Sequence, residues 1–427
     1  MGKKFLEPPR HFTLNNGMSV VIQDMPGKNS ILIELFVKIG FSNEKLKSNW
    51  GYTHFVEHMC FKGTKRRSQK KLNLEADSMG GEFDAYTDRE YTSFQINSHS
   101  KHYKQALDII SDIFYNSSFD PEEFSKEKGP IKEEIKMRYD NHDMRMYDLF
   151  SYNFFPENHG PSPIGSEEHI SSIKRDSLYK FYKDNYIPSN SILTISGNTS
   201  KIKESDIKNY FEDYSEPKNI LYHNSQFKLN KKKLIVDQDN SEQGKFYIVF
   251  PGMRYTDDNI ASLLLFDDLM AGGMSSRLFQ LLREEKGLCY SIYSVESSLK
   301  ESGFWLIGGA CSYDNIEKCV NTSIKEVKET LNGKLTKKEF EAIKNKFVTG
   351  LELSFESSSH FNDVNFESLF YREKLVDYYY LVNKIKDLKY QDCLQHMNDL
   401  WKDVDVPNVQ LLGNFGKKFN MKVSKIR

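Results

Sequence analysis

The sequence predicts an α+β protein made of two similar α/β-sandwich domains, each a mixed sheet covered by helices. The chain has 427 residues, which is long for one hydrophobic core and suits two domains of about 200 residues each. Strand and helix patterns alternate in the first half, and the same order of patterns restarts after a lysine-rich stretch. We therefore expect an internal duplication, although the two halves share little direct identity.

The first half begins with strand patterns on both sides of a hairpin signal, Asn15-Asn16-Gly17. A third strand, ILIELFVKIG, precedes a helix that we predict over residues 49–61, ended by Gly63. Ser68 has the position of an N-cap for a second helix, and Gly80-Gly81 ends that helix.

The remainder of the first half follows the same logic. EFDAYTDREYTSFQIN predicts two strands, HYKQALDIISDIFYN has helical periodicity, and Asp120-Pro121-Glu122-Glu123 starts another helix with its N-cap and first-turn proline. The half closes with the strand SILTISGN. We place the first domain at residues 1–212, a linker at 213–233 and the second domain at 234–427.

The second half repeats this plan. KKLIVDQDNSEQGKFYIVFPG and GFWLIGGAC predict strands, and IASLLLFDDLMAGG and SSRLFQLLREEKG predict helices. Thr336 and Glu339 form a capping box that opens a long helix. VQLLGNFG near the C-terminus corresponds to SILTISGN in the first half.

Composition excludes several classes of protein. Lys plus Arg is 59 and Asp plus Glu is 60, and this balance argues against a general nucleic-acid binder. No apolar run reaches the roughly eighteen residues of a membrane span, and the N-terminus has no secretory signal pattern. The five cysteines are scattered without C-x-x-C spacing, which favours a reducing compartment. We expect a cytoplasmic protein with no nucleic-acid partner and no membrane span.

The motif with the clearest chemistry is H-F-V-E-H, from His54 to His58. On a helix, positions i, i+3 and i+4 share one face, so His54, Glu57 and His58 lie together. Two imidazoles suit zinc, and H-x-x-E-H is the inverted zinc-protease signature. Glu57 is the candidate base that takes a proton from water. The alternative, two ordinary helix histidines, is disfavoured because the intervening apolar residues occupy another face.

Four longer motifs occur in one order along the chain. The first half carries GYTHFVEHMCFKGT, GGEFDAYT and EKGPIKEEI, and the second half carries GGMSSRLFQLLREEKGLCY. With these motifs the chain resembles the pitrilysin-type zinc peptidases, a family that includes insulin-degrading enzyme and mitochondrial processing peptidase. The resemblance covers most of the chain.

The resemblance implies a complete zinc site with one Zn²⁺ per chain. The family's third ligand is a glutamate about 76 positions after the second histidine, which corresponds to Glu134. A second family glutamate, Glu127, lies two helical turns earlier and would orient ligands or substrate. Glu133 is the competing candidate for the ligand, although it points about 100° away around a helix. Gly129-Pro130 departs from the family pattern, so we expect a kink or a restarted helix there.

The resemblance also assigns residues that contact substrate. Asp84, Ala85 and Thr87 lie in the family's strand that pairs with bound peptide; Asp84 stands where the family often has asparagine. The alternative is a plain strand with polar side chains. Arg283 and Tyr290 match a pair in the family's second domain that holds the substrate carbonyl and stabilises the oxyanion. The alternative is a surface arginine and a half-buried tyrosine.

The implied function is that of a zinc-dependent endopeptidase that cleaves peptides or short unfolded proteins in an enclosed chamber. General peptide turnover, leader-peptide removal and precursor processing all fit this activity. Two domains instead of the four of large family members imply a dimer, with an identical or a related subunit. The alternative is an inactive scaffold or partner subunit, which has no need for the full set of metal residues. The remaining histidines considered are interpreted as ordinary polar residues: His99, His102, His159 and His169.

Overall fold

The computed structural model describes residues 7–44, 47–155, 162–212, 226–416 and 419–426. Most of the predicted linker, 213–233, lies outside the described residues, as does His159. The chain forms two compact units, and each is described by itself. The first unit comprises residues 1–141, 158–224 and 354–378, and the second comprises residues 142–157, 225–353 and 379–427.

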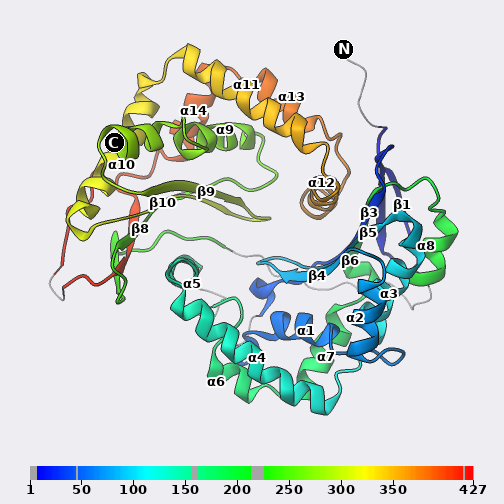
Figure 1. The fold of residues 1–427 in the computed structure, drawn as a ribbon. Helices are drawn as coiled ribbons and strands as arrows, with labels where there is room; N and C mark the ends of the chain where they lie inside the picture. Colours follow the sequence, from blue (N-terminus) through cyan, green and yellow to red (C-terminus); the bar gives the residue numbers. More distant parts are fainter. Residues whose placement is uncertain (1–6, 45–46, 156–161, 213–225, 417–418, 427) are drawn as a thin grey trace. The chain divides into compact units, whose positions relative to one another are not determined.

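The first unit is built on a six-stranded mixed sheet with the strand order β1-β2-β6-β3-β5-β4 (Figure 1). β6 is parallel to β2, and all other neighbouring strands are antiparallel. β4 lies at an edge of the sheet, because β5 is its only strand partner among the described residues. The strands are β1 (Arg10–Thr13), β2 (Ser19–Asp24), β3 (Ser30–Val37), β4 (Glu82–Thr87), β5 (Thr92–His99) and β6 (Ser191–Gly197).

The apolar core of this unit lies between one face of the sheet and a layer of helices. Leu35 of β3 and Phe55 of α1 are fully buried in that core. Ser68 and Asp120 cap α2 and α4 as predicted from the sequence. The helices of the unit are α1 (Tyr52–Cys60), α2 (Gln69–Asp77), α3 (Tyr103–Asn116), α4 (Pro121–Asp140), α6 (Glu167–Ser172), α7 (Arg175–Asn185), α8 (Glu204–Phe211) and α12 (Ser358–Arg372).

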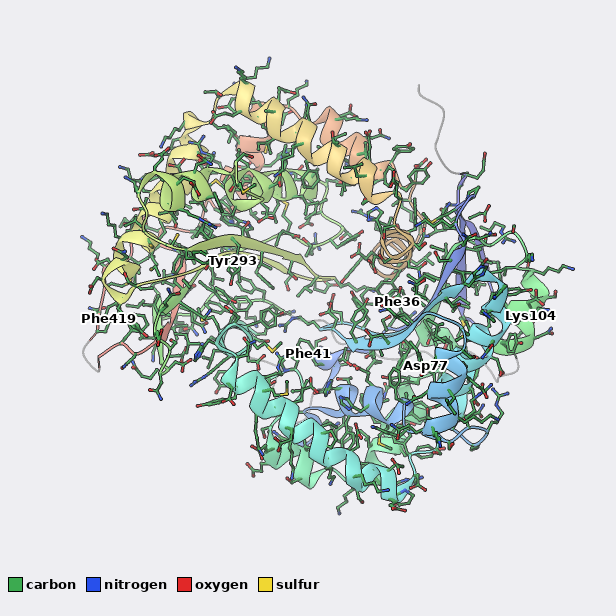
Figure 2. All side chains as sticks on the ribbon, in the orientation of Figure 1. Phe36, Phe41, Asp77, Lys104, Tyr293 and Phe419 are labelled. Carbon is green, nitrogen blue, oxygen red and sulfur yellow. The ribbon has the colours of Figure 1, made fainter. Side chains whose placement is uncertain are left out.

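The opposite face of the sheet is polar, and α12 from the second half of the chain packs on it (Figure 1). Glu34 of β3 is buried there, and its carboxylate accepts hydrogen bonds from the Ser93 hydroxyl at 2.6 Å and the Asn362 amide at 3.3 Å. The ring of Phe36, labelled in Figure 2, stacks on Phe366 with 3.9 Å between ring centroids. Burial raises the pKa of Glu34 to about 7, although the hydrogen bond from Ser93 lowers it.

The second unit contains a five-stranded sheet with the order β7-β11-β8-β10-β9. Helix α5 comes from the first half of the chain, and Phe150 of α5 lies 4.8 Å from Phe304 of β10, ring centroid to ring centroid. Tyr293 of β9, labelled in Figure 2, packs against the same aromatic cluster. The elements are α5 (His142–Phe154), β7 (Leu234–Gln238), β8 (Gly244–Pro251), α9 (Ile260–Ala271), β9 (Ser291–Ser298), β10 (Gly303–Cys311), α10 (Ile316–Glu329), α11 (Lys337–Ser354), α13 (Tyr380–Asp387), α14 (Tyr390–Leu400) and β11 (Asn408–Gly413).

The five strands of the second sheet repeat the topology of β2 to β6 in the first, which confirms the predicted α+β fold with two related units. β7, β8, β9, β10 and β11 take the places of β2, β3, β4, β5 and β6 in strand order, and β11 is parallel to β7 as β6 is to β2. One helix of each half packs in the other unit. These helices are α5, the third α-helix after β5, and α12, the third α-helix after β10. None of the described helices combines the length and apolar character that a membrane crossing needs.

Two helices differ from a simple expectation. Of the kink or restarted helix predicted at Gly129-Pro130, the restart is wrong, because α4 continues through Pro130 as one helix; the kink stays a prediction. Proline removes a single backbone donor, and the buried side chains of Phe124 and Ile131 anchor the helix on both sides of it. In the second unit, residues Phe279–Glu285 form a π-helix, in which the Lys286 N–H bonds the Leu281 carbonyl.

Candidate metal centre

Helices α1 and α4 bring three potential metal ligands of the first unit to one point. His54 Nε2 and His58 Nε2 lie 3.3 Å apart. Glu134 Oε2 lies 3.4 Å from His54 Nε2 and 3.5 Å from His58 Nε2. Among the described residues, this is the one group of three such side chains whose ligand atoms converge.

The size of this triangle fits zinc. Zinc binds imidazole nitrogen and carboxylate oxygen at about 2.0–2.1 Å, and tetrahedral angles then separate ligand atoms by about 3.3–3.4 Å. The observed separations of 3.3, 3.4 and 3.5 Å agree with that value. Three protein ligands leave a fourth position for water or substrate, and the Glu134 side chain is 39% exposed beside the buried His54.

The two imidazoles differ in protonation in the metal-free chain, and zinc would displace a proton from His58. Burial, together with the charge of His58, lowers the pKa of His54 to about 3, so this ring is neutral at physiological pH. His58 Nδ1 lies 2.8 Å from Glu127 Oε1 and donates to it, so its Nε2 points to the shared centre. Burial lowers the pKa of His58, but its hydrogen bonds to Glu127 and Glu134 outweigh burial and raise it to about 9.

Glu127 is held by a second partner, Lys62. Glu127 is only 5% exposed, and its Oε2 lies 2.6 Å from Lys62 Nζ. Burial raises the pKa of Glu127, but the hydrogen bonds from His58 and Lys62 keep it below its usual value. A charged carboxylate on the outer nitrogen of a ligating histidine fixes the ring and makes it a better ligand. Glu133 points elsewhere: its side chain is 68% exposed and pairs with Lys136 at 2.7 Å.

The candidate base, Glu57, is positioned by the edge strand. The Thr87 hydroxyl of β4 donates a hydrogen bond to Glu57 Oε2 at 2.5 Å. Burial raises the pKa of Glu57 to about 7, although the bond from Thr87 lowers it. A carboxylate with a pKa near neutrality can both take and return a proton, as a general acid–base group requires.

The free edge of β4 lies beside this base. The Asp88 N–H bonds the Tyr91 carbonyl at 2.8 Å, and backbone bonding alternates along an antiparallel pair. The register Asp84↔Gln95 therefore turns the N–H and C=O of Asp84 towards β5, and those of Ala85 and Thr87 away from it. Outward-facing groups of this kind pair with extended peptides.

A buried carboxylate fixes the start of α1. Glu44 Oε2 accepts the Gly51 N–H at 2.8 Å, and Oε1 accepts the Thr53 N–H at 2.7 Å and the Thr53 hydroxyl at 2.5 Å. These bonds satisfy N–H groups that a helix leaves unpaired at its first turn. Gly51 has φ +87°, and a Cβ there would lie 2.8 Å from the Ile164 carbonyl oxygen. The helix therefore begins at Tyr52, two residues before His54, with little freedom.

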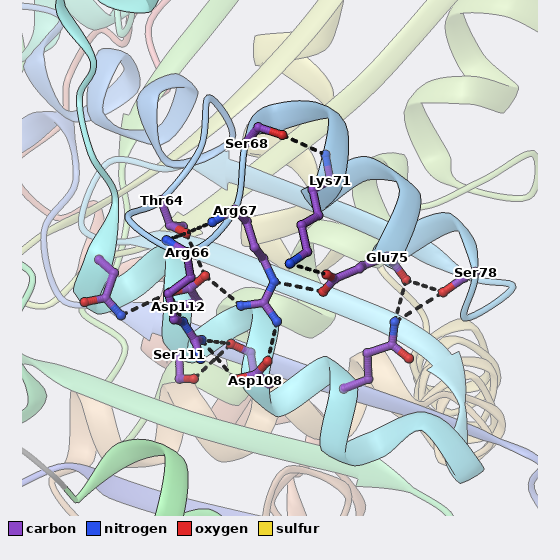
Figure 3. Close-up of polar contacts among 12 residues, drawn as sticks. Thr64, Arg66, Arg67, Ser68, Lys71, Glu75, Ser78, Asp108, Ser111 and Asp112 are labelled. Carbon is purple, nitrogen blue, oxygen red and sulfur yellow. Dashed lines mark hydrogen bonds and ion pairs between the residues drawn. The ribbon is translucent and has the colours of Figure 1, made fainter.

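An ion-pair network fixes the chain after α1 (Figure 3). Asp112 of α3 is fully buried and accepts hydrogen bonds at 2.7 Å from the Thr64 hydroxyl, from Arg66 Nε and from Arg67 Nη1. Arg67 also reaches Asp108. Several charged bonds on one buried carboxylate hold the turn between α1 and α2 against α3.

Comparisons with known proteins agree with this site. Residues 19–166 match the family insulinase (peptidase family M16), and residues 172–347 match the peptidase M16 inactive domain. YmxG of Bacillus subtilis, described as an uncharacterized zinc protease, is 34% identical over 82% of this chain and 85% of its own. An uncharacterized zinc protease of Rickettsia bellii is 30% identical over 91% of this chain and 94% of its own. The chain belongs to peptidase family M16.

Solved structures show the same fold as this M16 chain. A protease from Helicobacter pylori matches with a TM-score of 0.85 and 21% identity, over 96% of this chain and 100% of that one. The periplasmic protease PqqL from Escherichia coli matches with a TM-score of 0.76 and 17% identity, over 98% of this chain and 52% of that one. The resemblance inferred from the sequence is confirmed, and the chain carries the ligand set of a zinc protease.

Arg283 and Tyr290 of the M16 chain lie in the second compact unit. The Arg283 guanidinium lies 5.0 Å from the centre of the Tyr290 ring and 4.8 Å from that of Phe279. Tyr290 is 75% exposed, more than the half-buried tyrosine of the alternative interpretation. The structure thus pairs the two side chains, and their predicted contact with the substrate carbonyl stays a prediction.

Two residues of the site were missed by sequence reasoning. Lys62 lies four positions after His58, one helical turn on, and this spacing is the signal that could have identified it. Glu44 lies nine positions before Thr53 and outside α1, and no local pattern links the two residues.

Proposed function

We propose that this chain is a zinc-dependent endopeptidase that cleaves extended segments of peptides or unfolded proteins. The observation that carries the proposal is the triangle of His54, His58 and Glu134, with Glu57 held beside it by Thr87. The family supports the reaction class, and the open edge of β4 supports an extended substrate.

The chain's residues divide the work of peptide-bond hydrolysis. His54, His58 and Glu134 would hold the metal, which when bound lowers the pKa of a water molecule and polarises a carbonyl. Glu57 accepts the proton of the attacking water and later passes it to the leaving amine. Ala85 offers backbone groups that fix an extended peptide, which reduces the entropy cost of reaching the reactive geometry.

The second unit contributes Arg283 and Tyr290 in this proposal, because positive and hydroxyl donors stabilise the negative charge that develops on the carbonyl oxygen. Leader removal, precursor processing and general peptide turnover all use this chemistry. A dimer and a cytoplasmic location stay predictions of the sequence; light scattering of the active species tests the first and cell fractionation the second.

The test compares the full chain with Glu57→Gln. Each protein is loaded with zinc, its metal content is measured, and it is given quenched fluorescent peptides. We expect one zinc per chain in both, and a rate for the variant lower by about 10²–10⁴-fold. Full cleavage by the variant would remove Glu57 as the base. Zinc binding without cleavage by the parent chain would favour the inactive partner-subunit alternative.

A further inference from the structure

The carboxylate of Asp84 closes the peptide-binding edge of the free chain. Asp84 Oδ1 accepts the Ala85 N–H at 2.9 Å. That N–H faces away from β5. Asp88 bonds Tyr91, and every second residue before it on β4, including Asp84, has its backbone groups turned towards β5, whereas Ala85 has them turned outward. An incoming peptide carbonyl needs this same N–H, so binding displaces the Asp84 side chain.

In the described part of the free chain, the Asp84 carboxylate is not engaged in an ion pair that peptide binding would have to break. No ion pair to Asp84 occurs among the described residues, and its side chain is exposed. Glu82 is a second acid on the same face of β4, two positions before Asp84. Unlike Asp84, it lines a cavity of about 310 Å³ that also contains a cation, Lys28.

Strand geometry determines which peptide residue meets this carboxylate. A residue paired directly opposite on an adjacent strand has its side chain on the same face, with Cβ atoms about 4.5–5.5 Å apart. Opposite charges at such positions are favourable and like charges are unfavourable. Asp84 lies three positions along β4 from Thr87, which holds the base Glu57. The peptide residue that meets the carboxylate is the one paired directly opposite Asp84.

We propose that Asp84 is a specificity-determining residue: it caps the Ala85 N–H in the free chain and, when a peptide displaces it, pairs with a lysine or arginine of that peptide. The inference rests on the proposed endopeptidase function and names its substrate class, extended peptides with a basic residue at the position opposite Asp84. Peptides with an acidic residue at that position are disfavoured, because like charges then lie directly opposite each other.

Binding without chemistry tests the proposal first. Fluorescence anisotropy measures peptide affinity for the metal-free full chain carrying Glu57→Gln. The probes are decapeptides identical except for arginine, glutamine or glutamate, moved one position at a time. We expect arginine to bind about three- to tenfold more tightly than glutamine at one position, and glutamate to bind more weakly than glutamine. Added Asp84→Asn should bring the arginine-to-glutamine ratio to about one.

Two further variants separate the cap from the charge. Asp84→Ala removes both and exposes the Ala85 N–H, so the glutamine peptide should bind about two- to fivefold more tightly than to Asp84→Asn, which keeps an acceptor oxygen. Asp77→Asn is the matched control, because Asp77 is an exposed acid on α2 (Figure 2), and it should keep the arginine preference.

The outcomes distinguish this inference from the proposed function. An unchanged arginine preference in Asp84→Asn, or no preference at any position in the parent, overturns the role of Asp84 even if the wild-type chain cleaves peptides. An arginine preference that depends on Asp84 supports the inference even if the zinc-loaded wild type cleaves none of them, a result that would count against the endopeptidase alone.

Discussion

Replacing Glu127 by glutamine tests whether the partner of His58 tunes the metal site. Glu127 Oε1 accepts from His58 Nδ1 at 2.8 Å, and Oε2 meets Lys62 Nζ at 2.6 Å. Glutamine keeps the shape and one acceptor oxygen for His58. It removes the negative charge and turns an amide N–H₂ towards the Lys62 ammonium, where two donors face each other.

The expected magnitude follows from these two contacts. A hydrogen bond that involves a charged group contributes about 1.5–3 kcal/mol, and a neutral one about 1 kcal/mol. The orientation of His58 therefore loses about 0.5–2 kcal/mol, which corresponds to about 2–30-fold weaker zinc binding. Loss of an outer partner of a ligating histidine elsewhere costs about 10–100-fold in metal affinity, which overlaps this range.

Competition with a chromophoric chelator at fixed pH measures the zinc affinity of the parent chain and of Glu127→Gln. Glu133→Gln is the control on the same helix, since Glu133 is 68% exposed and pairs with Lys136; its affinity should equal that of the parent. Circular dichroism of the metal-free variant checks that it folds. Zinc affinity of Glu127→Gln within twofold of the parent would refute the reasoning.

The remaining predictions concern pH and position. Burial lowers the pKa of His58 but Glu127 and Glu134 raise it to about 9, so zinc displaces a proton and its affinity should rise about tenfold per pH unit between about pH 6 and 8; a flat chelator-competition profile contradicts this. Thr87→Val loses the bond to Glu57 and should lower kcat about 10–100-fold with zinc content and KM kept, while Thr87→Ser retains activity; equal kcat for both rejects the role. Burial raises the pKa of Glu34 from 4.5 to about 7, so the stability that its bound proton contributes is fully present below about pH 4.5 and is lost as pH rises through about 7. The Tm of Glu34→Gln should therefore fall less than the Tm of the parent between about pH 5 and 8. Parallel curves of Tm against pH for the two proteins would show that Glu34 is not the group responsible.

Sequence reasoning succeeded where a few neighbouring residues decide the structure. The caps at Ser68 and Asp120 and the box formed by Thr336 and Glu339 occur as predicted, with the Thr336 N–H donating to Glu339 Oε2 at 2.8 Å. The hairpin around Gly17 also forms, and Gly17 has φ +86°. Each of these depends on bonds that span three or four positions.

Contacts between distant residues were less accessible. The spacing of His54 and His58 predicts two ligands on one helix, but only the family resemblance pointed to Glu134. Pro130 predicted a kink or a restarted helix from a local rule, and buried side chains on both sides of it keep α4 continuous, so the helix does not restart. A periodic pattern shows which face of a helix is apolar, but it does not say which sheet that face covers. The destinations of α5 and α12 follow from tertiary contacts alone.

The traded helices α5 and α12 make each half of the chain depend on the other to fold. A break between residues 212 and 226 leaves the N-terminal piece with the aromatic face of Phe150 on α5 uncovered and with the polar sheet face of Glu34 without α12. The C-terminal piece keeps α12 without the sheet it covers, and its own sheet lacks α5. Neither piece is a self-sufficient folding unit. Two copies of one ancestral half that exchange such a helix constitute a domain-swapped dimer. Joining them into a single polypeptide makes that exchange permanent.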